Sequence, residues 1–74
     1  YIQTIMTFDQ KKFRFDLINK RIVELDITMQ IASEQIGISK ATYSRVEGGK
    51  EPDLHTFGLI CGWIGKGVNR YFVK

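Results

Sequence analysis

The chain has 74 residues, of which 43% are hydrophobic, and its eleven Lys and Arg against eight Asp and Glu give a formal net charge of +3. This length suits one small domain near the lower limit for an independent core, and it leaves little room for the cleft of an enzyme. Cys61 is the only cysteine, so no intramolecular disulfide is possible, and no apolar run approaches the roughly 20 residues that cross a bilayer. We therefore expect a cytoplasmic, non-enzymatic protein with no membrane partner, whose mildly basic charge permits a polyanionic one.

The first third of the chain predicts an arm and one long helix. Residues 1–8 alternate apolar and polar side chains, so they are either a short extended arm or an unstructured one, native or appended. From Asp9 to Leu25 there is no Gly or Pro. Apolar residues spaced by three or four predict an amphipathic helix here. Its expected buried stripe is Phe15, Ile18, Ile22 and Leu25.

A second helix is predicted from a capping residue at its start and a glycine at its end. Thr28 is a suitable N-cap, and Ile36 is the last residue of the periodic pattern. Gly37 then follows, where a left-handed C-cap is easiest for glycine. The expected core stripe of this helix is Met29, Ala32, Ser33 and Ile36.

A third, short helix is expected to begin after Ser39 as N-cap and to end at Glu47. Ile38 and Tyr43 have the spacing of a hydrophobic staple, and Val46 continues their buried side. At about 100° per residue, a second set of side chains shares the opposite face. These small or cationic residues are Lys40, Ala41, Ser44 and Arg45.

Asp53 is the expected N-cap of a fourth helix, which Gly65 ends. Its predicted apolar stripe is Leu54, Phe57, Cys61 and Ile64. Residues 68–73 predict a final short helical turn. Residues 9–74 therefore form one all-α domain, a compact bundle of four to five helices.

The middle of the chain resembles the phage-repressor and Cro-like helix-turn-helix family. Residues 34–50 read EQIGISKATYSRVEGGK, followed by Pro52-Asp53, Thr56-Phe57 and CGWIG at 61–65. The resemblance extends from about Phe15 to Phe72. It implies a lambda-repressor-like fold and a transcriptional regulator, a repressor, that binds double-stranded DNA as a homodimer. The helix Ser39–Glu47 would then enter the major groove.

The resemblance also assigns roles to individual residues. Contacts to base edges fall on Lys40, Ala41, Thr42, Ser44 and Arg45, and contacts to phosphates on Thr28, Met29, Gln30, Ser39, Tyr43 and Lys50. Arg45 can pair with guanine through two hydrogen bonds, and Lys40 can reach guanine acceptors. Met29 departs from the family, which often has Gln at that position. Tyr43 is expected mainly in the core, with its hydroxyl reaching a phosphate.

Glu47 is expected to form a structural ion pair with Arg21, because a glutamate here often pairs with an arginine of the first helix in the family. His55 has no spaced partner ligands, and Cys61 lies on an apolar stripe, so we expect no metal, cofactor or small-molecule ligand.

The alternative function is an antitoxin-type or other protein-interaction module with weak DNA binding, in which Ile31 and the C-terminal aromatic residues contact a protein. For a homodimer, the fourth helix and the apolar tail are the expected contact. The tail residues are Val68, Tyr71, Phe72 and Val73.

Overall fold

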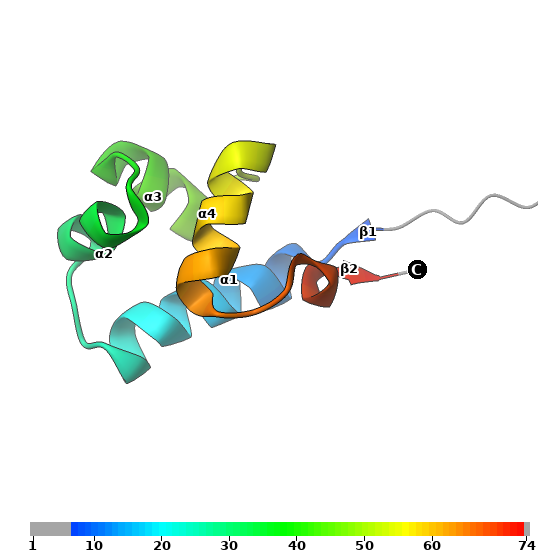
Figure 1. The fold of residues 1–74 in the computed structure, drawn as a ribbon, viewed down its shortest axis with the longest axis horizontal. Helices are drawn as coiled ribbons and strands as arrows, with labels where there is room; N and C mark the ends of the chain where they lie inside the picture. Colours follow the sequence, from blue (N-terminus) through cyan, green and yellow to red (C-terminus); the bar gives the residue numbers. More distant parts are fainter. Residues whose placement is uncertain (1–6, 74) are drawn as a thin grey trace, which may run out of the picture.

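The computed structural model describes residues 7–73, and within them helices form one bundle around a single core (Figure 1). The α-helices are α1 (Gln10–Ile18), α2 (Met29–Ile36), α3 (Lys40–Glu47) and α4 (Leu54–Ile64). Helix α1 continues directly into the wider π-helical turns of η1 (Asn19–Glu24), and a 3-10 helix, η2 (Val68–Tyr71), follows α4. The expected all-α class is confirmed. No helix within these residues is long and apolar enough to cross a membrane.

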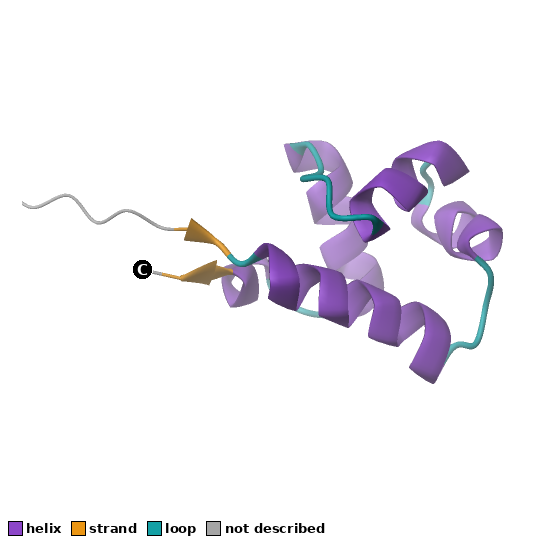
Figure 2. Ribbon diagram, turned by 180° about the vertical axis from the view of Figure 1, so that it is seen from behind, coloured by secondary structure: helices purple, strands orange, loops and turns teal. Residues whose placement is uncertain are grey.

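The two ends of the described chain lie side by side (Figures 1 and 2). Strand β1 (Thr7–Phe8) pairs antiparallel with β2 (Phe72–Val73), with Phe8 opposite Phe72. The two rings lie 5.6 Å apart, and both lie against Phe57 of α4. The predicted arm is therefore partly a strand, and residues 1–6 lie outside the described residues. The predicted last turn of helix ends at Tyr71, because the chain then extends to pair with β1.

The helix boundaries agree with the capping signals in the sequence. The Thr28 hydroxyl accepts a hydrogen bond from the Ile31 amide at 3.2 Å, and the Asp53 carboxylate accepts one from Thr56 at 2.8 Å. Each cap satisfies an amide that the helix itself leaves without an acceptor. Gly37, at φ +93°, closes α2 in the left-handed conformation. The predicted start and end of α2 are confirmed.

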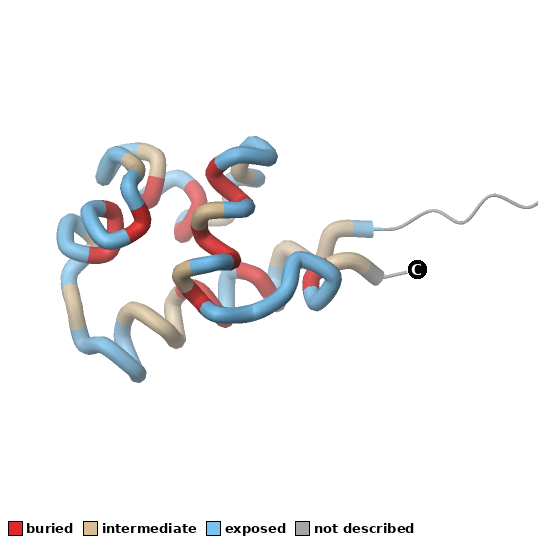
Figure 3. Tube along the Cα trace, in the orientation of Figure 1, coloured by how far each residue is buried: buried red, intermediate tan, exposed pale blue. Residues whose placement is uncertain are grey.

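The core is built from all four α-helices and from η2 (Figure 3). Its buried hydrophobic residues are Phe13, Leu17, Ala32, Ile36, Tyr43, Val46, Phe57, Ile60, Cys61, Ile64 and Tyr71. The predicted stripe of α2 is confirmed, with Met29 half-buried beside Ala32, Ser33 and Ile36. Because Tyr71 is fully buried, it cannot serve as the dimer contact that the sequence predicted.

The predicted buried stripe of the first helix is wrong. Phe13 and Leu17 enter the core, whereas Phe15, Ile22 and Leu25 are exposed. Apolar residues lie on two sides of this helix. The side that is buried also carries the carboxylate of Asp16, so its sequence resembles that of a side facing water. The structure compensates this carboxylate with hydrogen bonds from the C-terminal segment, so it can be buried.

One residue of the predicted α4 stripe also lies outside the core. Phe57, Cys61 and Ile64 are buried, as expected, but Leu54 is 87% exposed. Leu54 is the first residue of α4, and the helix enters the core only about one turn later. The predicted stripe is therefore correct from Phe57 onward, and Leu54 does not belong to it.

Candidate nucleic-acid interface

Helices α2 and α3 are joined by a tight turn, residues 37–39 (Figure 1). The amides of Gly37 and Ile38 both donate to the Ser33 carbonyl, at 2.9 and 3.0 Å. Ser33 is buried, and its hydroxyl donates to the Gln30 carbonyl at 2.7 Å. The turn is therefore held by the last turn of α2, which fixes the direction in which α3 begins.

The inner side of α3 is anchored to η1 by an ion pair. Arg21 donates through Nε to Glu47 Oε2 at 2.8 Å and through Nη2 to Oε1 at 2.7 Å. Tyr43 is fully buried, and its hydroxyl donates to Glu47 Oε2 at 2.7 Å. Burial alone would raise the pKa of Glu47, but the hydrogen bonds from Arg21 and Tyr43 outweigh it and lower the pKa. The predicted Arg21–Glu47 pair is present in this structure.

Further arginine contacts that the sequence did not suggest hold the same region. Arg14 Nε donates to the backbone carbonyl of Glu47 at 2.6 Å, where a cation also compensates the negative end of α3. Arg21 Nη1 donates to the Ile27 carbonyl at 3.2 Å. An arginine that bonds a backbone carbonyl 33 residues away leaves no local sequence signal. The position of α3 is thus fixed from η1, α1 and the turn before α2.

The outer side of α3 carries the residues predicted to contact bases. Lys40, Ala41, Ser44 and Arg45 are all exposed, and none of them belongs to the core. Thr42 is half-buried at the edge of this face, where its hydroxyl accepts a hydrogen bond from Ser39 at 2.8 Å. We call the exposed residues Lys40, Ala41, Ser44 and Arg45 the α3 face.

The residues predicted to contact phosphates divide into accessible and inaccessible ones. Those exposed are Thr28, Gln30, Ser39 and Lys50. Met29 packs partly against the core, so at the start of α2 it offers chiefly its backbone amide. The Gln30 side chain donates to Glu34 at 2.8 Å.

The predicted phosphate contact of Tyr43 is wrong. Its side chain has no exposed surface, and its hydroxyl is engaged by Glu47. Burial, together with the neighbouring Glu47 carboxylate, raises its pKa, so the hydroxyl keeps its proton and remains a donor inside the protein. Tyr43 therefore positions α3 from within.

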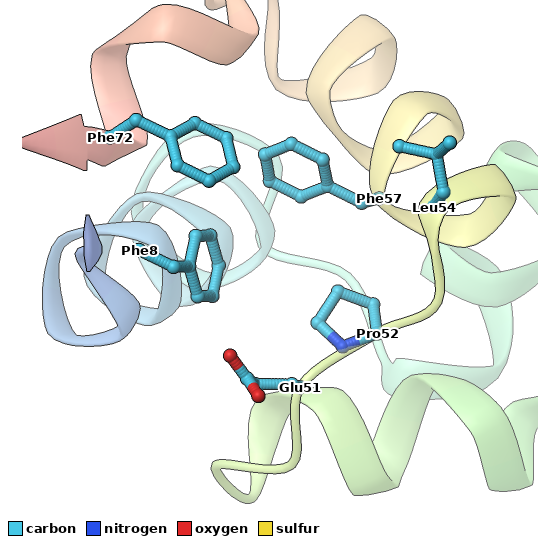
Figure 4. A pocket seen from close by; sticks show the side chains of 6 residues that line it. All are labelled: Phe8, Glu51, Pro52, Leu54, Phe57 and Phe72. Atoms are coloured by element: carbon cyan, nitrogen blue, oxygen red, sulfur yellow. The ribbon is translucent and has the colours of Figure 1, made fainter. Parts of the chain in front are cut away.

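Two hollows share Glu51 and Pro52, just before α4, and one of them extends to α3. One, of about 270 Å³, is lined by Thr42, Arg45, Val46, Lys50, Glu51, Pro52, Asp53 and Thr56, so cations and carboxylates share its wall. The other, of about 240 Å³, is mainly apolar (Figure 4). Its lining is Phe8, Glu51, Pro52, Leu54, Phe57 and Phe72.

Cys61 is buried in the core, on α4. Burial raises the pKa of the Cys61 thiol to about 11, which makes it unreactive near neutral pH. Within residues 7–73, no group of three or more His, Cys, Asp or Glu residues is placed to hold a metal ion.

No family model matches this chain, and no curated protein or solved structure matches it either.

Proposed function

We propose that this chain is a sequence-specific double-stranded DNA-binding domain with a lambda-repressor-like fold, acting as a transcriptional repressor. The observation that carries the proposal is the α3 face. This face carries two exposed cations, Lys40 and Arg45, beside two small side chains on the same short helix. The other side of that helix is anchored by Tyr43 and by the Arg21–Glu47 pair.

Each part of this surface has a role in binding a duplex. The small Ala41 and Ser44 let the helix backbone approach the floor of the major groove, while Arg45 and Lys40 reach guanine acceptors. Lys50, and the exposed amides at the starts of α2 and α3, would contact phosphates. A single motif helix of this kind buries little area, so we expect two copies to bind two half-sites related by a two-fold axis.

The proposal is tested by selecting bound duplexes from a random-sequence pool. We compare the wild type with Lys40→Ala/Arg45→Ala and with Lys12→Ala/Lys66→Ala, which removes the same charge away from the α3 face. We expect the wild type and the control to enrich the same two-fold related motif. The α3 variant should enrich none and should lose roughly tenfold or more in affinity, as expected for each bidentate base contact.

Enrichment of the same motif by the α3 variant would refute readout through α3. Loss of phosphate contacts alone would lower the affinity of the α3 variant for every duplex but leave the enriched motif unchanged, since the phosphate contribution does not depend on sequence. The two variants therefore separate sequence readout from general attraction to DNA.

A second candidate is an antitoxin-type or other protein-interaction module with weak DNA binding. It is favoured by the exposed apolar side chains of α1 and η1, among them Phe15 and Val23. The dependence of binding affinity on salt concentration distinguishes a DNA-binding domain from a protein-interaction module. Binding to DNA weakens log-linearly as salt rises, whereas an apolar protein interface changes little.

A further inference from the structure

The outer side of α1 and η1 carries apolar residues that the core does not use. Phe15 is 68% exposed and Val23 72% exposed, and Ile22 and Leu25 are exposed beside them. We call these four residues the α1–η1 strip. Scattered single apolar residues are ordinary on a protein surface, but several large ones on one continuous helical segment indicate a contact surface.

The π-helical turns bring the two most exposed residues onto the same side. The Leu25 amide donates to the Lys20 carbonyl at 3.0 Å, five residues back, so each turn here holds more residues than an α-helical turn. At 100° per residue, Val23 lies within about 80° of Phe15 around the helix, and the smaller rotation per residue of the wider turns reduces that angle. Phe15 and Val23 therefore share one side of the segment.

The charges at the two ends of the strip are complementary. Lys11 and Arg14 are exposed near its start, and Arg14 also bonds the Glu47 carbonyl. Glu24 and Asp26 are exposed near its end, where Glu24 also meets Lys20 of its own chain at 3.5 Å. In an antiparallel arrangement about a two-fold axis, the basic end of one copy faces the acidic end of the other. A parallel arrangement would place like charges together. The strip is therefore complementary to itself in one orientation.

We propose that two copies of this chain pair through the α1–η1 strip as an antiparallel, two-fold symmetric dimer. The strip exposes roughly 400 Å² of apolar side chain per copy, as large as the apolar patches that mark contact sites on monomers. Two such patches would bury about 800 Å² of apolar surface in total, which is below the roughly 1,200 Å² of stable interfaces and in the range of weak, transient ones. The dimer is thus weak and forms at micromolar or higher concentration.

This pairing uses elements other than α3, so it does not depend on DNA binding. It differs from the predicted contact through the fourth helix and the C-terminal tail, of which Tyr71 is buried in the core of its own chain. The strip includes none of the four residues of the α3 face, since the two surfaces belong to different helices.

Sedimentation velocity over a wide range of protein concentration, without DNA, tests the proposal. The wild type should shift from monomer to dimer mass as concentration rises. Phe15→Glu/Val23→Glu should remain monomeric throughout. Leu54→Glu, which changes an equally exposed apolar residue outside the strip, should associate like the wild type. Far-ultraviolet circular dichroism on each sample shows that the variants are folded, as expected for exposed positions.

Exchanging charges tests the orientation. Lys11→Glu and Glu24→Lys should each weaken association several-fold, and the double variant should restore it, because each end then meets its opposite charge again. A monomeric wild type at all concentrations would overturn the proposal, and so would association that survives Phe15→Glu/Val23→Glu. The sedimentation experiment contains no DNA, so its result does not depend on whether the chain selects a DNA sequence. Either proposal can therefore be refuted without refuting the other.

Discussion

Two carboxylates are buried in this domain, and each is surrounded by the same kinds of group. Glu47 accepts a hydrogen bond from the hydroxyl of Tyr43, and Asp16 accepts one from Tyr71 at 2.8 Å. Both tyrosines are fully buried, and each carboxylate also pairs with an arginine. One cluster attaches α3 to η1, and the other attaches the C-terminal η2 to α1.

The two clusters differ in how far water reaches the arginine. The Arg21 side chain is only 14% exposed, and its two nitrogens meet the Glu47 carboxylate at 2.7 and 2.8 Å. The Arg70 side chain is 42% exposed, and its contacts with Asp16 are unequal, at 2.6 and 3.4 Å. A buried charge that loses its partner stays uncompensated, whereas an exposed one turns to solvent. The same chemical groups should therefore contribute differently to stability.

The largest effect is expected from breaking the inner pair. Glu47→Gln should lower the free energy of unfolding by about 3 kcal/mol, because it leaves Arg21 charged and mostly buried. Arg21→Met should do the same to Glu47. The double variant should cost much less than the sum of the two, which denaturant unfolding of all four proteins would measure. Additive effects would show that the two groups do not interact.

The outer pair should be less sensitive. Asp16→Asn keeps the shape of the side chain and should lower the free energy of unfolding by about 2 kcal/mol, through loss of the charged hydrogen bonds. Arg70→Met should cost less than Arg21→Met in the same denaturant measurement. If Arg70→Met were the more harmful of the two, exposure would not explain the difference between the clusters.

The tyrosine hydroxyls should have smaller and similar effects. Tyr43→Phe and Tyr71→Phe each remove one hydroxyl from a buried carboxylate, which retains its arginine. Each should lower the free energy of unfolding by about 1.5 kcal/mol, and the two values should agree, because both side chains are equally buried. Thermal unfolding of the two variants side by side is sufficient. A large difference would indicate that one hydroxyl supports its carboxylate more than the other.

The stability of the fold should not depend on pH near neutrality and should decrease only as the solution becomes acidic. The Arg70 hydrogen bond, aided by Tyr71, lowers the pKa of Asp16 below its ordinary 3.8 despite burial. Glu47 likewise has a pKa below its ordinary 4.5, although burial opposes the shift. Both carboxylates therefore stabilise the fold fully above about pH 4.5, and the contribution is lost as pH falls through the lowered folded values.

Denaturant unfolding between pH 7 and pH 3 measures this response. The free energy of unfolding should change little down to pH 5 and then decrease. Glu47→Gln and Asp16→Asn should each have a shallower decrease than the wild type, because each lacks one of the two groups. A variant curve that runs parallel to the wild-type curve would exclude that carboxylate as a source of the acid response.

The sequence predicted best what depends on neighbouring residues. The caps at Thr28 and Ser39 and the left-handed Gly37 determine where α2 and α3 begin and where α2 ends, and each acts over a few residues. The Arg21–Glu47 pair was predicted from the family resemblance. Neither kind of signal could place Asp16 beside Arg70, because they are 54 residues apart and meet only when the ends of the chain come together.

The buried side of the first helix was mispredicted for a related reason. Periodicity alone could not choose between the row of Phe15 and the row of Phe13 and Leu17, and the polarity of Asp16 favoured the wrong one. The phosphate contact of Tyr43 came from the family resemblance, which does not show that Glu47, one turn further along α3, accepts a hydrogen bond from its hydroxyl. In both cases a buried polar group reversed the rule that polar residues face water.

The pairing of β1 with β2 has a mechanical consequence. Thr7 is opposite Val73 at the outer end of the pair, so tension applied to the two ends pulls the strands apart one contact at a time. The load then reaches the bond between the Asp9 amide and the Tyr71 carbonyl, and after it the Asp16–Arg70 contact. A domain loaded in this way opens by successive small steps, because its bonds are never strained together. It should yield to weak force from its ends while α2 and α3 are still folded.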